Sequence, residues 1–276
     1  MTDIVFHAGV FLVGACIGSF LNVCIARWPL GLSVVRPRSR CPRCEHQIAW
    51  FENIPIASWL ALRARCRGCR TPISPVYPLV ELVVGLGWLA AVIQWGPTLT
   101  ALRVAVFGTV LLGIMLTDAE HMEIPDGFTV FGFLTGLIGA AAATRTGELG
   151  PFADFMGALL GACAGAGAIA IVKWLGEVVL KREAMGFGDI TLMAFVGAHL
   201  GTARSLVTIF LGALLGALLT VPLVTAAWWL NRRRGVSVES PEIPFGIFLA
   251  PAAFIALLWW TQLATLYIEY MTRIYG

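Results

Sequence analysis

The sequence predicts an all-α polytopic membrane protein of about eight transmembrane helices, with a small zinc-ribbon-like insert on the cytoplasmic side. First, 58% of its 276 residues are hydrophobic and 13% charged, with a mean hydropathy of +0.83, outside the usual range of soluble domains. Second, apolar stretches of about 20 residues recur, which is the length of a membrane-spanning helix, and they lack the two-residue alternation of a barrel. Third, one polar segment carries paired cysteines.

The apolar stretches predict eight membrane spans. They cover residues 4–26, 77–95, 99–117, 127–143, 155–178, 188–203, 205–230 and 245–268. The sixth is short and starts at Asp189, so we expect it to be tilted, packed inside the bundle or only marginally spanning. The chain is accordingly divided into a first transmembrane helix (1–26), a cytoplasmic insert (27–76) and a transmembrane core (77–276).

The distribution of basic residues predicts the orientation. Nine of the 19 Lys and Arg residues lie between Arg27 and Arg70, after the first span, and this loop is expected to be cytoplasmic. Alternating spans then place Lys181, Arg182 and the run 232–234 on the same side, with both termini outside. Because topology explains these charges, no nucleic-acid partner is expected. The first helix is expected to be retained, since it lacks the basic start of a signal peptide.

The insert contains two C-x-x-C pairs, Cys41 with Cys44 and Cys66 with Cys69, separated by 21 residues. Two such pairs can place four thiolates at the corners of a tetrahedron around Zn²⁺. The alternatives are disulfides, which a reducing cytoplasm disfavours, and a redox motif, which usually occurs singly. We therefore predict a structural zinc that stabilises the insert, which is too small to form a large hydrophobic core.

Two acids at the ends of apolar spans are the candidates for catalysis. Asp118 ends the third span and Asp189 opens the sixth, and the predicted topology puts both at the cytoplasmic edge. Two close carboxylates share a proton, so one can activate water while the other donates to a peptide carbonyl. Taken singly, Asp118 could be a solvated loop acid and Asp189 a helix cap.

Three further features are candidates for supporting roles. Gly186 and Gly188 are expected to leave the backbone beside Asp189 open to an extended substrate. Asp126, after Pro125, is expected to cap the 127–143 helix, with a supporting catalytic role as the other possibility. Glu81, just inside the second span, is more suggestive of function than of packing.

Seven ordered motifs resemble those of the bacterial type IV prepilin peptidases, membrane aspartic proteases of the G-x-G-D kind. Besides the two C-x-x-C pairs, they are GSFLNVCIAR (18–27), NIPIASWLALRARCRGC (53–69), PISPVYPLVE (72–81), TDAEHMEIPD (117–126), GFGD (186–189) and IPFGIFLAP (244–252). They extend over most of the chain, and their order makes the resemblance far more specific than any one motif.

The resemblance implies cleavage of the basic leader from type IV prepilins or type II secretion pseudopilins at the cytoplasmic face of the bacterial inner membrane. It implies that Asp118 and Asp189 form the catalytic pair. It also implies methylation of the new N-terminus with S-adenosylmethionine, for which Glu81 is the candidate residue; no Gly-rich nucleotide motif is visible. The family often has Lys where this chain has Thr191, which leaves the pH optimum of the pair open.

Two other classes of function remain to be weighed. A proton-coupled membrane transporter could use the same two aspartates as proton carriers, with the zinc module as a regulator. A non-catalytic scaffold could use the zinc module to dock a partner, but the pairing of the acids argues against it. Loss of leader cleavage on replacing either aspartate distinguishes the peptidase from both.

Overall fold

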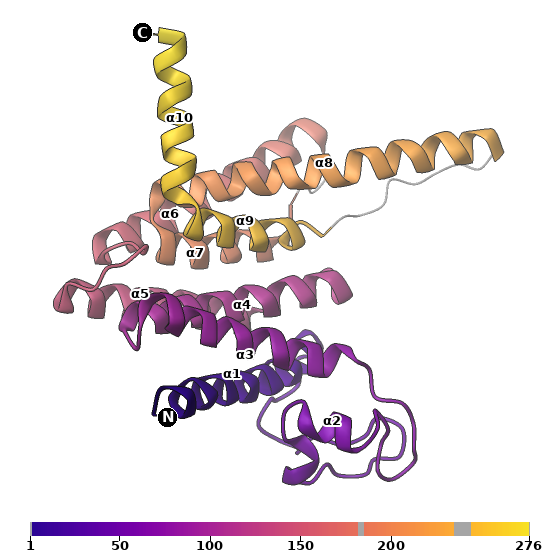
Figure 1. The fold of residues 1–276 in the computed structure, drawn as a ribbon. Helices are drawn as coiled ribbons and strands as arrows, with labels where there is room; N and C mark the ends of the chain where they lie inside the picture. The colour runs from indigo at the N-terminus through magenta and orange to yellow at the C-terminus, as the bar shows by residue number, and fades with distance from the viewer. Residues whose placement is uncertain (1, 182–184, 235–243, 276) are drawn as a thin grey trace. The chain divides into compact units, whose positions relative to one another are not determined.

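The computed structural model describes residues 2–181, 185–234 and 244–275, which are mainly helical and, in these ranges, contain no strand beyond two isolated β-bridges (Figure 1). The helices are α1 (Thr2–Arg27), α2 (Ala57–Ala61), α3 (Val76–Trp95), α4 (Leu99–His121), α5 (Asp126–Thr146), α6 (Phe155–Leu180), α7 (Phe187–Leu200), α8 (Thr202–Arg234), α9 (Gly246–Leu258) and α10 (Trp260–Tyr275), with 3-10 turns at Trp28–Leu30 and Trp50–Asn53. The all-α class is confirmed. Arg182, used above for orientation, lies outside the described residues.

Six of the described helices are long and apolar enough to cross a membrane: α1, α3, α4, α5, α6 and α8. The predicted sixth span corresponds to α7, which has only 14 residues. The predicted span over 245–268 corresponds to two helices, α9 and α10, which together are apolar enough for one span but meet at an 82° bend near Trp259. The apolar sequence extends past this bend, but Thr261, Gln262 and Thr265 make the following helix a poor continuation into hydrocarbon.

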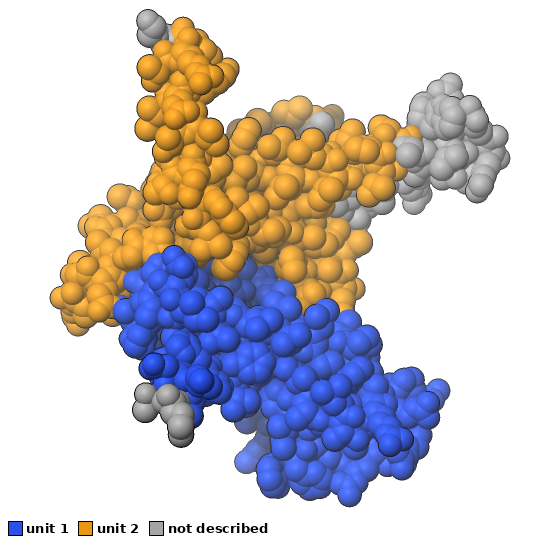
Figure 2. All heavy atoms as spheres, in the orientation of Figure 1, with its two compact units in different colours: residues 1–113 blue, residues 114–276 orange. Residues whose placement is uncertain are grey.

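The chain forms two compact units, residues 1–113 and 114–276, coloured separately in Figure 2. In the first unit, α1 packs along α3 at small residues. A Cβ added at Gly18 would lie 2.8 Å from the Glu81 Cα, so only glycine permits this approach. The three-part division predicted from sequence, 1–26, 27–76 and 77–276, stays a prediction.

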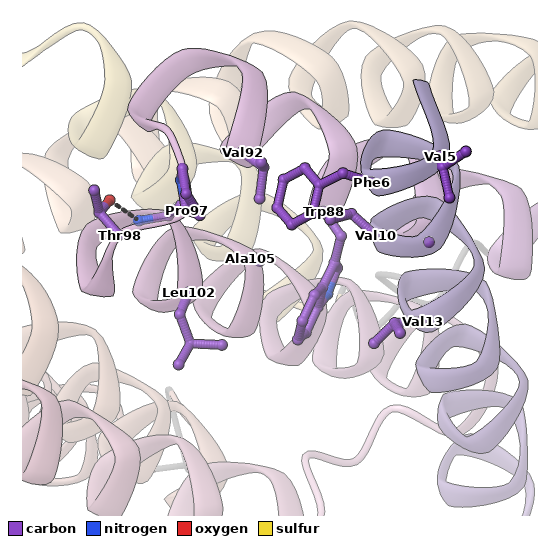
Figure 3. A pocket seen from close by; sticks show the side chains of 12 residues that line it. Val5, Phe6, Val10, Val13, Trp88, Val92, Pro97, Thr98, Leu102 and Ala105 are labelled. Carbon is purple, nitrogen blue, oxygen red and sulfur yellow. Dashed lines mark hydrogen bonds between the residues drawn. The ribbon is translucent and has the colours of Figure 1, made fainter. Parts of the chain in front are cut away.

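The first unit also contains an apolar cavity of about 470 Å³ between α1, α3 and α4, lined by side chains that include Phe6, Val10, Trp88 and Leu102 (Figure 3). None of its lining residues is ionisable. It therefore offers no group for acid–base chemistry, which must be sought elsewhere.

In the second unit, α7 is internal, which is one of the three arrangements expected for the weakest span. Its residues from Leu192 to Leu200 are nearly all buried, and it packs against α5, α6, α8 and α9. The backbones of α6 and α7 touch at Gly161 and Gly197, where a Cβ on either residue would collide with the other helix. Because its neighbours exclude lipid, a short helix carrying Asp189 at its start can be accommodated.

Helix α9 runs antiparallel along α8. A Cβ at Gly216 would lie 3.3 Å from Phe248, and one at Gly212 would lie 2.9 Å from Leu249, so the backbones approach closely along this contact. At the other end of α9, the Arg204 guanidinium lies 5.3 Å from the ring centroid of Trp260. This antiparallel packing positions the first turn of α9 beside the aspartates described in the next section.

Candidate active site

Asp118 lies in the last turn of α4 with its side chain buried, 4% exposed. Its Oδ2 accepts a hydrogen bond of 3.1 Å from the Ile247 backbone N–H, in the first turn of α9. Unbonded N–H groups at a helix N-terminus carry partial positive charge and favour an anion. The first turn of α9 therefore holds this carboxylate in place and stabilises its ionised form.

Asp189 is the third residue of α7 and is also buried, 8% exposed. Its Oδ2 accepts the backbone N–H of Gly186, the N-cap residue, at 3.2 Å. A carboxylate at this position reaches back to the N-cap as in half of a capping box. Asp189 therefore does cap the start of α7 through this hydrogen bond. Capping alone does not explain why its side chain is buried, because a capping carboxylate can be exposed.

The loop between α4 and α5 brings the two acids into one region. Ile124, from this loop, packs against Gly188 on the Asp189 side and against Gly246 on the Asp118 side. The carboxylates of Asp118 and Asp189 are close enough to interact electrostatically. Two acids separated by 71 positions in the sequence thus meet in a buried setting.

The two glycines before Asp189 differ from each other. Gly186 is exposed, and the nearest atom to an added Cβ is 3.7 Å away. At Gly188, a Cβ would lie 2.8 Å from the Ile124 Cβ. The expectation of open backbone therefore fits Gly186 alone. Gly188 is required because Ile124 already occupies the space beside it.

Thr191 supplies no charge to the site. Its hydroxyl donates to the Gly188 carbonyl at 3.0 Å, a local bond within the first turn of α7. A different ammonium reaches the segment before Asp189, because the Lys173 Nζ donates to the Met185 carbonyl at 3.2 Å and lies 3.6 Å from Glu177. Lys173 thus places an ammonium beside the backbone that precedes Asp189.

Asp126 is the first residue of α5, exposed, and the N-cap position is Pro125. The prediction that Asp126 caps this helix is therefore displaced by one residue, because Pro125 already has the extended backbone of a cap. Glu120, in the last turn of α4, and Glu123, in the loop that follows, are exposed as expected for solvated acids.

The four cysteines of the insert form one cluster. The Sγ atoms of Cys41, Cys44, Cys66 and Cys69 all lie within 4.8 Å of one another, with separations of 3.8 Å for Cys41–Cys69 and 3.9 Å for Cys44–Cys66. These distances far exceed a disulfide bond of about 2.05 Å. They match the spacing of about 3.8 Å expected between thiolates that each lie about 2.3 Å from a tetrahedral zinc. The cluster fits the predicted metal.

The two C-x-x-C pairs have the same backbone fold. In each, the N–H of the first cysteine donates to the carbonyl five residues later, and the N–H four residues later donates back to the first cysteine. Glu45 and Arg70 occupy equivalent positions with φ of +56° and +59°. Near Cys69, the hydroxyl and the backbone N–H of Thr71 lower the thiol pKa to about 6, which favours the thiolate that zinc requires.

Glu52 connects three segments of the insert beside this cluster. Its Oε2 accepts the Ala49 N–H at 2.9 Å and lies 3.1 Å from the His46 Nε2, while Oε1 lies 3.5 Å from Arg67. The Ala49 hydrogen bond and, after it, the His46 ring and the Arg67 guanidinium hold the pKa of Glu52 below its usual range. An ionised Glu52 thus ties the two cysteine pairs to the chain between them.

Glu81 is buried in α3 and accepts the Ile56 backbone N–H on Oε2 at 2.7 Å. Ile56 has φ +62° and ψ −51°, and the Ala57 N–H donates to the Pro55 carbonyl. This is the geometry of the strained γ-turn, which a β-branched residue adopts only where its surroundings impose it. Glu81 therefore ties the insert to α3, and a role in methyl transfer stays a prediction.

Sequence reasoning missed Gly246, Ile247 and Ile124 as parts of the site. A Cβ at Gly246 would lie 2.7 Å from the Asp118 Oδ2 and 3.1 Å from the Ile124 Cδ1. The motif IPFGIFLAP marked this segment as shared with a family, but nothing in the residue types indicated contact with an acid 129 positions away.

A polytopic helical membrane protein with two buried aspartates, one following G-x-G, is equipped as a membrane aspartic protease. The chain belongs to the type IV leader peptidase family. The model of that family matches residues 105–221, and the model of the bacterial peptidase A24 N-terminal domain matches residues 12–95.

Relatives named prepilin leader peptidase/N-methyltransferase are similar over most of the chain. The Myxococcus xanthus protein is 46% identical over 219 residues, which is 78% of this chain and 63% of that protein. Those of Aeromonas hydrophila and Pseudomonas aeruginosa are 35% and 36% identical, each over 94% of this chain and 92% of the relative. No solved structure matches the chain. None of these matches supports a transporter.

Proposed function

We propose that this protein cleaves the basic leader from type IV prepilins and related type II secretion pseudopilins, with Asp118 and Asp189 as the catalytic pair. The observation that carries the proposal is the meeting of two buried aspartates, each held by a backbone N–H, in a member of the leader peptidase family.

The chemistry follows from the pair. The ionised carboxylate takes a proton from water as the water attacks the peptide carbonyl, and the protonated one donates to the carbonyl oxygen. Collapse of the tetrahedral intermediate then expels the amine, which takes a proton from the pair. Exposed Gly186 offers a place where extended substrate backbone can approach Asp189.

Replacement of either acid tests the assignment. Asp118→Asn and Asp189→Asn in the purified protein are each expected to abolish leader cleavage, followed by the mass of a prepilin substrate. Asp154→Asn is the matched control: Asp154 caps α6 through the Gly157 N–H at 2.8 Å, and Asn caps as well as Asp. Cleavage at the control's rate by either active-site variant refutes the pair.

The basic leader is expected to be attracted by the exposed acids at the end of α4 and in the loop that follows. Glu120 and Glu123 follow Asp118 directly in the chain, and opposite charges raise the rate of encounter at low salt. The double variant Glu120→Gln and Glu123→Gln should raise the substrate KM and weaken its salt dependence. An unchanged KM across salt concentrations rules out this steering. Cleavage is proposed to occur at the cytoplasmic face of the inner membrane, the side on which the distribution of basic residues predicts the insert and both aspartates to lie.

Methylation of the new N-terminus is proposed as the second activity, because the relatives reported above carry N-methyltransferase in their names. S-adenosylmethionine would supply the methyl group, and one mass measurement with and without it reports both reactions. Zn²⁺ is proposed for Cys41, Cys44, Cys66 and Cys69, where it would hold the two halves of the insert together. The lipid bilayer is the expected surroundings of the apolar helices.

A further inference from the structure

The C-terminal helix α10 is amphipathic, with polar and apolar residues on separate sides. Its six polar residues, Thr261, Gln262, Thr265, Glu269, Thr272 and Arg273, recur at intervals of one, three or four residues and occupy about a third of the helix circumference. Aromatic and aliphatic residues fill the rest. Glu269 and Arg273 are four residues apart on the polar face, so the helix carries no net charge.

The apolar face of α10 is exposed beyond its first turn. Tyr267, Tyr270 and Ile274 are 62%, 61% and 52% exposed, and every residue from 265 to 270 is exposed. The first turn is held to the bundle by the Arg204 guanidinium over the Trp260 ring. A broad apolar surface with large aromatic side chains is therefore without a cover in the described part of the chain.

The packing of α9 fixes the level at which α10 begins. Helix α9 runs antiparallel to α8, whose span covers Thr202–Thr225, and Arg204 lies two residues from the start of that span. Trp260 therefore lies at the same membrane boundary as the beginning of α8. The 82° bend then turns α10 away from the direction of α8 and α9, as Figure 1 shows.

We propose that α10 lies in the interface of the bilayer at the face where α8 begins, with its apolar side on the acyl chains and Glu269 and Arg273 toward water. An interfacial helix has this combination of a large apolar arc, a polar stripe and aromatic anchors. At 16 residues and 1.5 Å per residue it is about 24 Å long, which is short of the roughly 30 Å hydrocarbon core. In water it would expose tyrosine and isoleucine side chains.

The placement of α10 in the interface also affects the position of Asp118, an inference that rests on the proposed function. Helix α9 links α10 to Ile247, the residue that binds Asp118, through 13 residues, about 20 Å of helix. A helix fixed in the interface at one end sets the depth of the carboxylate at the other.

Spin-label depth measurements test the placement without reference to activity. Single cysteines are introduced at Leu263, Tyr267, Tyr270 and Ile274 on the apolar side and at Thr265 and Glu269 on the polar side. Cys16, Cys24 and Cys163 are first replaced by alanine, and this background protein, which keeps the four cysteines of the insert, is labelled in parallel so that its signal can be subtracted. The protein is reconstituted in phosphatidylethanolamine vesicles with a minor fraction of phosphatidylglycerol. Leu214→Cys, on exposed mid-span α8, serves as the deep reference.

The expected result is high access to oxygen on the apolar side and to a water-soluble nickel chelate on the polar side. For an α9 parallel to the bilayer normal, an 82° bend changes depth by only about 3 Å over the whole of α10. A depth change of about 16 Å between positions 263 and 274 indicates a spanning helix and overturns the proposal. Equal nickel access on both sides, or shielding of the apolar side from both reagents as by a second copy, also overturns it.

Discussion

Gly246→Ala is the substitution that most directly tests how Asp118 is held. The new Cβ would lie 2.7 Å from the Asp118 Oδ2, where ordinary contact begins at 3.4 Å, so the carboxylate must move by about 0.7 Å. The 3.1 Å bond from the Ile247 N–H cannot survive a shift of that size. Hydrogen bonds to charged groups contribute about 1.5–3 kcal/mol. At 1.36 kcal/mol per tenfold, kcat/KM should fall by about ten- to a hundredfold.

The assay is the initial rate of prepilin leader cleavage in detergent, with the thermal unfolding midpoint recorded alongside. Gly167→Ala is the matched control, because a Cβ at Gly167 in α6 meets nothing within 4 Å. That variant should cleave normally and be no less stable, since alanine favours helix over glycine. A folded Gly246→Ala protein that cleaves at the control's rate would show that the first turn of α9 does not position Asp118.

Ile247→Pro removes the same hydrogen bond by another route. Proline is tolerated in the first turn of a helix, where its missing N–H has no helical partner, and the preceding Gly246 has no Cβ to clash with the ring. The loss of cleavage should match that of Gly246→Ala. Ile247→Ala, which keeps the N–H and shortens the side chain, should retain most of the rate. Equal losses in the proline and alanine variants would assign the effect to the isoleucine side chain instead.

Three further outcomes are expected. Gly186→Ala should raise the prepilin KM more than it lowers kcat, because the added methyl group obstructs an open stretch of backbone without displacing other atoms; a change in kcat alone contradicts substrate docking there. Cys66→Ser should reduce the zinc content measured by elemental analysis, whereas Cys163→Ser, outside the cluster, should leave it at the wild-type level; zinc retained in both refutes the four-cysteine site. Glu81→Ala should destabilise the insert by about 1–3 kcal/mol, since it leaves the Ile56 N–H without its acceptor, and Glu81→Gln should destabilise it less. Limited proteolysis of the insert measures both effects. Equal proteolysis of wild type and Glu81→Ala would contradict the attachment of the insert to α3 through Glu81.

Local patterns were sufficient wherever a short sequence carries its own physical requirement. The C-x-x-C pairs predicted a four-thiolate cluster, because the spacing itself brings two sulfurs to one side of a turn. The apolar stretches predicted the helices, because backbone groups in lipid must bond within the same segment. The short span starting at Asp189 was expected to be tilted, packed inside the bundle or only marginally spanning, and the structure selects the second, because α7 is internal.

The same patterns failed where the outcome depends on a partner. Residues 245–268 are mainly apolar, so hydropathy gives no signal for the bend at Trp259. Only the structure shows that α9 and α10 are separate helices and that the polar residues lie on one side of α10. Gly186 and Gly188 look alike in the sequence, and only Ile124 distinguishes them. Pro125 took the cap that was expected of Asp126.

The sequence by itself determined the membrane class, the order of the helices, the four cysteines that cluster and the two acids worth testing, because each follows from composition or from spacing over a few residues. Only the tertiary structure decided which backbone groups hold those acids. The N–H that binds Asp118 comes from Ile247, 129 positions away, and every residue except proline carries that same donor. Since no side chain encodes the contact, only the packing of α9 against α8 and the Ile124 loop can select it.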